Sequence, residues 1–215
     1  MYSGFIGADL VIEAYGDNII GNHHGFFQGE IFPVIGICPV IGGAIGLALA
    51  LSKYPRNQRA RTALQLVDII TPGLILAQAI GRFGNFINQE AFGRPTSLPW
   101  GLFIDLAHRP IGYAQFDFFH PTFLYEALGD IAIFILLWWL SMGKKSAPLG
   151  VVSGWYFLLY GILRFFVEGV RLDSLLFGSS RVAQWMSLLF VGIGVALLLN
   201  AFRQRNAEKK NAPSV

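Results

Sequence analysis

The chain has 215 residues, of which 54% are hydrophobic and only 13% are charged, whereas soluble domains are about 25% charged. Its mean hydropathy is +0.53, so the composition excludes an ordinary soluble domain and indicates an integral membrane protein. The net charge of +3 could suggest nucleic acid, but all five lysines come just after long apolar runs, as in cytoplasmic loops of membrane proteins. We therefore expect no nucleic-acid partner.

The first segment, residues 1–31, is too polar to span a membrane. Residues 1–30 contain four acids, two histidines and neither lysine nor arginine, which predicts a non-cytoplasmic segment. The adjacent pair His23-His24 could bind a metal, but a solvated loop is the better interpretation.

Five apolar runs follow, each close to the roughly 20 residues that a bilayer needs. They cover residues 32–51, 64–87, 121–142, 149–170 and 183–202. Pro33 and Pro39 in the first run and Pro72-Gly73 in the second predict kinked or re-entrant segments. The fold class is therefore an all-α, polytopic helical bundle of about five transmembrane helices, with one membrane domain over residues 32–202.

Basic residues give this bundle an orientation. Ten of the 16 lysines and arginines lie in three predicted inner segments, among them a basic tail at 203–215, so the N-terminus is expected outside and the C-terminus in the cytoplasm. The other six are all arginines: Arg82, Arg94, Arg109, Arg164, Arg171 and Arg181. Arginine binds carboxylate or phosphate through two parallel hydrogen bonds, so the outer half is expected to hold such partners.

The outer loop at 94–120 is rich in proline, glycine and aromatic residues. Two interpretations are equally compatible with it. It could form an aromatic belt at the membrane surface, or it could lie on the outer leaflet and shape the path of a lipid.

The second run ends in a polar motif at 81–94, where Arg82, Asn85, Asn88 and Glu90 follow apolar residues. Ionisable groups at membrane depth indicate a functional site. On an ideal helix these polar positions spread too widely to face one cleft. We therefore expect either that the helix ends near Gly84 or that polar protein surrounds the motif.

The third run supplies a second polar group. His120 precedes it, and Tyr125 and Glu126 follow within two turns. Glu126 and Asp130 are four residues apart on one helix face, which is unfavourable for two like charges unless one is protonated or paired.

The fourth run supplies a third group, because Tyr160, Arg164 and Glu168 are spaced four apart and form one stripe. Arg164 and Glu168 could simply neutralise each other. However, the predicted topology brings all three groups to one depth, near the outer headgroups. Paired arginines suit a phosphate diester, and a nearby carboxylate or histidine suits proton abstraction.

Three motifs carry a specific resemblance. They are Gly81-Arg82-x-Gly84-Asn85-Phe86-x-Asn88-x-Glu90-x-x-Gly93, His120-Pro121-x-x-x-Tyr125-Glu126, and Tyr160-Gly161-x-x-Arg164-x-x-x-Glu168 with Arg171 after it. Together they resemble the prolipoprotein diacylglyceryl transferases of bacterial inner membranes. The resemblance runs from about Gly42 to Phe202.

The resemblance implies a transferase that moves the diacylglyceryl group of phosphatidylglycerol onto the lipobox cysteine of a prolipoprotein. The products are a thioether and glycerol 1-phosphate, in the first step of lipoprotein maturation by protein lipidation. The implied partners are the bilayer, phosphatidylglycerol and the prolipoprotein signal peptide. No cofactor or metal is implied.

It also implies roles for individual residues. The catalytic set is Arg82, Glu90, His120 and Arg164; phosphatidylglycerol is bound by Arg82, Asn85, Asn88, Gly93, Tyr160 and Arg164; and Tyr125, Glu126, Glu168 and Arg171 support them. The two arginines are expected to hold the phosphate. Glu90 either positions Arg82 or, with His120, deprotonates the thiol.

The chain departs from the family pattern near its start. The family carries about two further membrane segments before Gly42-Gly43, so we expect those spans to be missing here, and the family histidine position falls on Ile37. His120 is then the histidine left to reach the site. An inactive paralogue or fragment that binds lipid or protein is an alternative. A small transporter is disfavoured because the ionisable residues cluster at one depth.

Overall fold

The computed structural model describes residues 32–142, 148–172, 176–177 and 180–211. The predictions for residues 1–31, including His23-His24, and the Lys144-Lys145 pair lie outside this part, and the side chain of Ile37 is also outside it. The chain forms two compact units, residues 1–59 and 60–215. Each is described by itself.

The first unit contains helix α3 (Phe32–Ser52), which lies where the first span is predicted. Its portion Ile41–Ser52, where side chains are described, is an apolar helix shorter than a full membrane span. That α3 crosses the membrane therefore stays a prediction.

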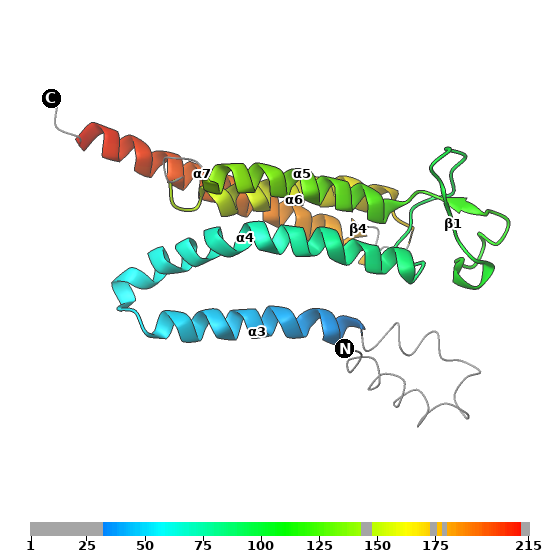
Figure 1. Cartoon of the computed structure of the whole chain (residues 1–215), viewed down its shortest axis with the longest axis horizontal. Helices are drawn as coiled ribbons and strands as arrows, with labels where there is room; N and C mark the ends of the chain where they lie inside the picture. Colours follow the sequence, from blue (N-terminus) through cyan, green and yellow to red (C-terminus); the bar gives the residue numbers. More distant parts are fainter. Residues whose placement is uncertain (1–31, 143–147, 173–175, 178–179, 212–215) are drawn as a thin grey trace, which may run out of the picture. The chain divides into compact units, whose positions relative to one another are not determined.

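Apart from residues 56–59 at the start of α4, the second unit contains four long helices: α4 (Arg56–Ile87), α5 (Thr122–Met142), α6 (Val151–Val170) and α7 (Val182–Asn211). Each contains a stretch long and apolar enough to cross a membrane, which confirms a polytopic helical membrane protein. Helices α5, α6 and α7 run side by side (Figure 1).

Two helices extend beyond the predicted membrane spans. Helix α4 begins at Arg56 rather than residue 64, and α7 continues past Phe202 to Asn211. In both places the added residues are mostly arginine, glutamine, alanine, glutamate and lysine, without glycine or proline. These residues favour helix, although their polarity ends the apolar run that sets a span prediction.

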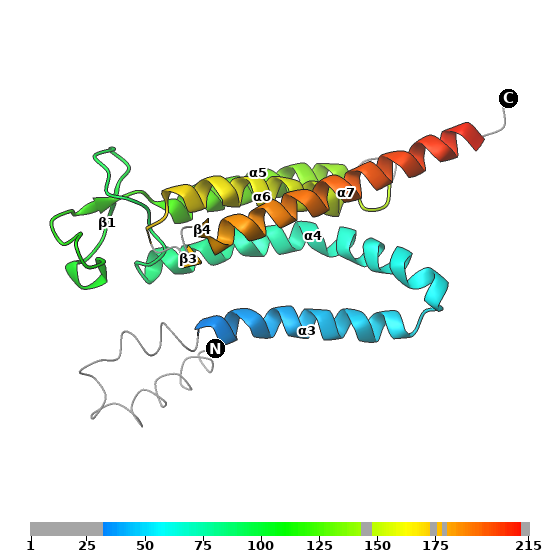
Figure 2. The same cartoon turned by 180° about the vertical axis from the view of Figure 1, so that it is seen from behind.

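Helices α6 and α7 approach closely at glycines, and Figure 2 shows α7 alongside α6. A Cβ atom at Gly161 would lie 2.8 Å from the Ser187 carbonyl oxygen, and one at Gly194 would lie 2.5 Å from the Leu158 nitrogen. Small residues are what allow two membrane helices to pack backbone to backbone. This contact fixes the helix that carries Arg164.

Helix α4 caps the start of α6. The Asp68 carboxylate accepts hydrogen bonds from Gly150 N (2.6 Å), Ser153 N (2.8 Å) and Ser153 Oγ (2.6 Å). The first N–H groups of a helix lack partners within it, and here a side chain of another helix supplies one. Asp68 therefore joins α4 to α6 at the end opposite the polar motifs.

The predicted outer loop is a small folded lobe, defined here as residues 94–120. It contains β1 (Leu102–Phe103), the short 3₁₀ helix η2 (Leu106–His108) and β2 (Phe118–Phe119), with β1 and β2 antiparallel. Ile104 and Phe119 of the lobe form a buried core together with Phe92, which precedes it. A second short antiparallel pair, β3 (Leu176–Phe177) and β4 (Ser180–Arg181), precedes α7.

Arg109 holds the lobe together. Its Nη2 lies 2.8 Å from Asp117 Oδ1, and its Nε donates to the Ile104 carbonyl at 2.8 Å. The guanidinium carbon lies 5.7 Å from the centre of the Phe103 ring, a cation–π distance. Arg109 thus has a carboxylate partner within the protein.

Candidate functional site

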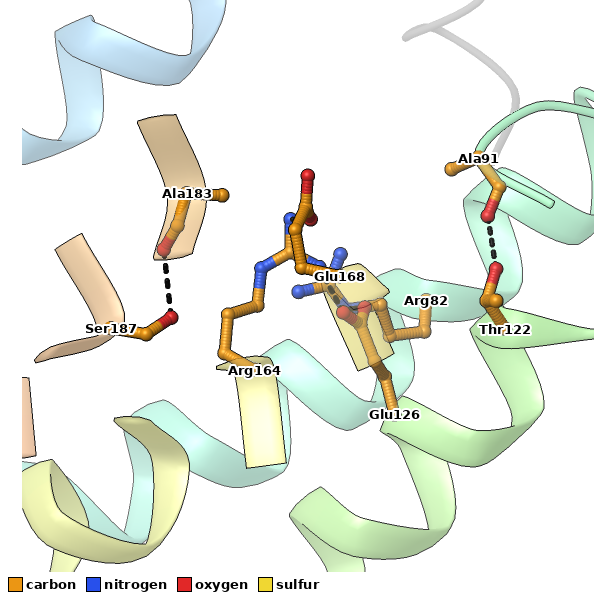
Figure 3. Close-up of polar contacts among 8 residues, drawn as sticks. All are labelled: Arg82, Ala91, Thr122, Glu126, Arg164, Glu168, Ala183 and Ser187. Carbon is orange, nitrogen blue, oxygen red and sulfur yellow. Dashed lines mark hydrogen bonds and ion pairs between the residues drawn. The ribbon is translucent and has the colours of Figure 1, made fainter. Parts of the chain in front are cut away.

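Two arginines and two glutamates from three helices form a compact cluster, which we call the arginine cluster: Arg82 of α4, Glu126 of α5, and Arg164 and Glu168 of α6. Arg82 Nε lies 2.6 Å from Glu126 Oε2, and Arg164 Nη1 binds Glu126 Oε1. Arg164 Nη2 lies 2.9 Å from Glu168 Oε2. Figure 3 shows the two guanidinium groups meeting around the Glu126 carboxylate.

Helical spacing explains how the cluster forms. Arg164 and Glu168 are four residues apart on α6, so their side chains meet on one face. Helix α4 continues past Gly84 to Ile87, which excludes the first of the two alternatives, a helix end near Gly84. Arg82 therefore projects from a regular helix, and it reaches Glu126 in the second turn of α5.

The glutamates of the cluster are buried, whereas its arginines are partly exposed. The glutamate side chains are 5% and 3% exposed, whereas each arginine side chain is 18% exposed. Two cations and two acids cancel, so the arginines can be held together inside the protein. The ion pair of Arg82 with Glu126 is made through Nε, so a bidentate anion could bind its two terminal nitrogens.

The rest of the first motif forms a tight turn after α4. Asn88 Nδ2 donates to Glu90 Oε1 at 3.1 Å, and Gln89 pairs with Asp105 of the lobe through hydrogen bonds of 2.7 and 2.8 Å. Gln89 and Ala91 have φ angles of 50° and 58°, in the left-handed region. The carboxylate partner of Arg82 is thus Glu126, and Glu90 bonds Asn88.

His120 belongs to a separate network that reaches into the lobe. Its Nδ1 lies 3.1 Å from the Tyr125 hydroxyl oxygen, and Trp100 Nε1 donates to that same oxygen at 3.1 Å. Within the described residues no hydrogen bond or ion pair joins His120 to the arginine cluster. Two polar centres therefore meet at the N-terminal part of α5: one contains Tyr125 and His120, which lies just before the helix, and the other contains Glu126.

Gly93 is the point where the three motifs meet. Its N–H donates to the His120 carbonyl at 2.8 Å, His120 N donates back to the Arg94 carbonyl at 3.0 Å, and Arg94 N donates to the Val170 carbonyl at 3.1 Å. A bridge also pairs Gly93 with Arg171.

The close approach at Gly93 leaves no room for a side chain. An added Cβ would lie 2.7 Å from His120 Cβ, 3.0 Å from Thr122 Cγ2 and 3.1 Å from Val170 Cγ1. Beside it, the Thr122 hydroxyl donates to the Ala91 carbonyl (Figure 3). Gly93 is buried, and its contacts link the backbone segments of the three motifs.

A stacked tyrosine pair extends the stripe on α6. The rings of Tyr156 and Tyr160 lie 5.6 Å apart and nearly parallel, at 4°. The Tyr156 hydroxyl donates to Gln78 Oε1 on α4 at 3.2 Å. Sequence reasoning missed Gln78 and Tyr156, yet each lies four residues before a predicted site residue, so extending the helical stripes by one turn would have found both.

Trp100, Thr122 and Asp68 were also missed as contributors. Their partners lie in other segments, so local sequence patterns contain no signal for them. Of the remaining predicted residues, Asn85 is half-buried and Arg171 joins the site region through its backbone bridge to Gly93.

Comparisons with known proteins agree on one family. The family model described as prolipoprotein diacylglyceryl transferase matches residues 4–200, so the resemblance begins well before Gly42. Three curated relatives, all named phosphatidylglycerol–prolipoprotein diacylglyceryl transferase, come from Synechococcus elongatus, Thermosynechococcus vestitus and Gloeobacter violaceus.

The identities are 45%, 40% and 45%, over 72%, 79% and 80% of this chain. The aligned regions cover 54%, 65% and 63% of those relatives. The chain therefore spans a little over half to about two thirds of the length of the relatives that it matches.

Proposed function

This chain belongs to the prolipoprotein diacylglyceryl transferase family, and from that premise we propose that it transfers the diacylglyceryl group of phosphatidylglycerol to the lipobox cysteine of a prolipoprotein. It is a membrane-embedded bacterial protein by its family and its four membrane-compatible helices. The observation that carries the proposal is the pair Arg82 and Arg164, gathered at one buried carboxylate.

In this proposal the arginine cluster receives the phosphate of the lipid. The terminal nitrogens of Arg82 hold two phosphate oxygens, and Arg164 adds a second positive charge. The cysteine sulfur attacks the glycerol carbon that bears the phosphate ester, and the carbon–oxygen bond breaks with its electrons passing to the phosphate oxygen. Glycerol 1-phosphate leaves while the thioether forms. Preplaced cations stabilise this developing charge.

Glu126 and Glu168 act here as positioning residues. Each forms an ion pair with an arginine side chain, and Glu126 pairs with both guanidinium groups. A long arginine side chain otherwise loses considerable rotamer freedom on binding. Fixing both arginines before the lipid arrives therefore lowers the cost of binding the phosphate.

The thiol also needs a base or a positive environment, because its usual pKa is about 8.5. We assign the proton transfer to His120, whose ring is fixed by Tyr125 and, through it, by Trp100. Glu90 is the second candidate. Asn85, Asn88 and Tyr160 orient the headgroup, and Gly93 holds the backbone on which these groups stand.

We place the protein in the bacterial inner membrane, with the C-terminus in the cytoplasm and the site near the outer leaflet. The support is the charge pattern, in which the lysines gather in predicted inner segments while the cluster arginines lie at the other helix ends.

The direct test uses the purified full chain in vesicles that contain phosphatidylglycerol, together with a lipobox peptide. The expected result is a peptide whose mass has increased by one diacylglyceryl group, with release of glycerol 1-phosphate. Arg82→Ala should abolish the product, and vesicles of phosphatidylcholine alone should give none. An unmodified peptide with the wild-type chain, under conditions where one of the curated relatives modifies it, would contradict the proposal.

A further inference from the structure

One buried acid near the arginine cluster has no partner. Asp130 lies on α5, one helical turn after Glu126, and it is 0% exposed. Within the described chain neither of its carboxyl oxygens has a hydrogen-bond partner. Buried polar groups are almost always hydrogen-bonded, so this carboxyl group needs an explanation.

Asp68 provides a contrast within the same bundle. Its carboxylate accepts three hydrogen bonds, from Gly150 N, Ser153 N and Ser153 Oγ. These donors satisfy the acceptor oxygens of the Asp68 carboxyl group, as is usual for buried polar groups. Asp130 has no such donors, and an unpaired carboxylate in an apolar surrounding is very costly.

The surroundings of Asp130 contain both signs of charge. The titratable and charged groups within electrostatic reach are Arg82 of α4, Glu126 of its own helix, and Tyr156, Tyr160 and Arg164 of α6. Both arginines are already bound to Glu126, and Arg164 also binds Glu168. The two arginines near Asp130 are therefore already neutralised by the two glutamates.

We propose that Asp130 is a neutral carboxylic acid at neutral pH, and that this neutrality keeps the arginine cluster receptive to an anion. The cluster contains two positive and two negative charges, so a charged Asp130 would make it net negative. Asp130 then acts on the net charge around the arginine cluster and is not a catalytic residue. This second part of the inference depends on the proposed function, because it concerns the binding of a lipid phosphate.

The first test does not involve activity. The full chain in lipid nanodiscs is examined by infrared difference spectroscopy for the carbonyl stretching band of a protonated carboxylic acid. The wild type should show the band and Asp130→Asn should lose it, whereas Asp68→Asn should keep it. If Asp130→Asn fails to fold, wild-type protein carrying a heavy carbon isotope in its aspartate carboxyl groups should shift the band. A band that is absent in the wild type, or that survives in Asp130→Asn, overturns the assignment.

The second test uses the pH dependence of the KM for phosphatidylglycerol. As the pH rises Asp130 loses its proton, so the added negative charge should raise the wild-type KM by about tenfold, as expected for one unit charge at low effective dielectric. In Asp130→Asn this rise should vanish. Parallel KM profiles in the two proteins would refute the charge effect. Failure of transfer in both would refute the proposed function and leave the infrared assignment standing.

Discussion

Arg82 and Glu126 form an ion pair of 2.6 Å across α4 and α5, and the same carboxylate binds Arg164. Glu126 thus holds two guanidinium groups from two helices at one point. Both arginines remain 18% exposed while Glu126 is nearly buried. The carboxylate therefore anchors the arginines from inside and leaves their outer edges for a ligand.

Arg82→Lys keeps the positive charge but removes the planar fork. We expect transfer activity to fall about ten- to a hundredfold, because losing a charge-assisted hydrogen bond costs about 1.5–3 kcal/mol. The measurement is the rate of lipid transfer to a lipobox peptide, at a temperature where both proteins are folded. Arg61→Lys, at an exposed arginine of the same helix, is the control and should leave the rate unchanged. Near-normal transfer by Arg82→Lys would rule out bidentate phosphate binding.

Glu126→Gln removes the charge that both arginines share. Breaking a buried ion pair by neutralising one partner typically costs about 3–5 kcal/mol, so the thermal midpoint of the protein in nanodiscs should fall clearly. Glu90→Gln is the matched control, since Glu90 bonds Asn88 rather than an arginine, and it should change stability by less than about 0.5 kcal/mol. Equal losses in the two variants would contradict the central place of Glu126.

Gly93→Ala places a Cβ within 2.7 Å of His120 Cβ and 3.1 Å of Val170 Cγ1. Overpacking of this kind usually costs about 1–3 kcal/mol, and it should also separate the three motifs that meet there. We expect both stability and transfer to decrease, as measured by thermal unfolding and peptide modification. Gly169→Ala, where nothing lies within 4 Å of the added atom, should be neutral or slightly stabilising.

Asp68→Ala removes the carboxylate that caps α6. Loss of a capping side chain typically costs about 0.5–2 kcal/mol, and hydrogen exchange at the first amides of α6, including Ser153 N, should speed up. Asp117→Ala serves as a comparison because Asp117 lies in the lobe and its side chain is 60% exposed. Unchanged exchange at the start of α6 would show that the cap does not stabilise this helix.

Tyr125→Phe removes the hydroxyl that joins Trp100 to His120 but keeps the ring. If His120 takes the thiol proton in a fixed orientation, kcat should fall while the KM for phosphatidylglycerol stays near its wild-type value. The helix bundle should remain folded by circular dichroism. A rise in KM with unchanged kcat would instead assign Tyr125 to lipid binding.

Local spacing predicted one stripe of the candidate site. Tyr160, Arg164 and Glu168 share a helix face because a helix repeats every 3.6 residues, and this stripe is present on α6. The pairing of Arg82 with Glu126 could not be predicted in the same way, since it depends on how α4 packs against α5. The same holds for Asp68 and α6, which are far apart in the sequence.

The helix ends show a second reason for the differences. A span prediction follows apolarity, so it stopped at residue 64 in α4 and at residue 202 in α7, whereas both helices continue into charged residues. Backbone hydrogen bonding continues as long as the residues favour helix. The apolar run and the helix therefore end at different residues, and a hydropathy profile shows only the end of the apolar run.

The cap at Asp68 also fixes how far α4 and α6 are shifted along each other, and with it the positions of Arg82 and Arg164. From Asp68 to Arg82 the chain rises about 21 Å along α4, and from Ser153 to Arg164 it rises about 16 Å along α6, at 1.5 Å per residue. Helices α4 and α6 are thus joined at two places, directly by the cap at Asp68 and through Glu126 of α5 at the arginine cluster. One residue inserted between these two places would turn Arg82 by about 100° and break one of the two connections. The relative position of the two guanidinium groups therefore depends on the lengths of these two helix segments.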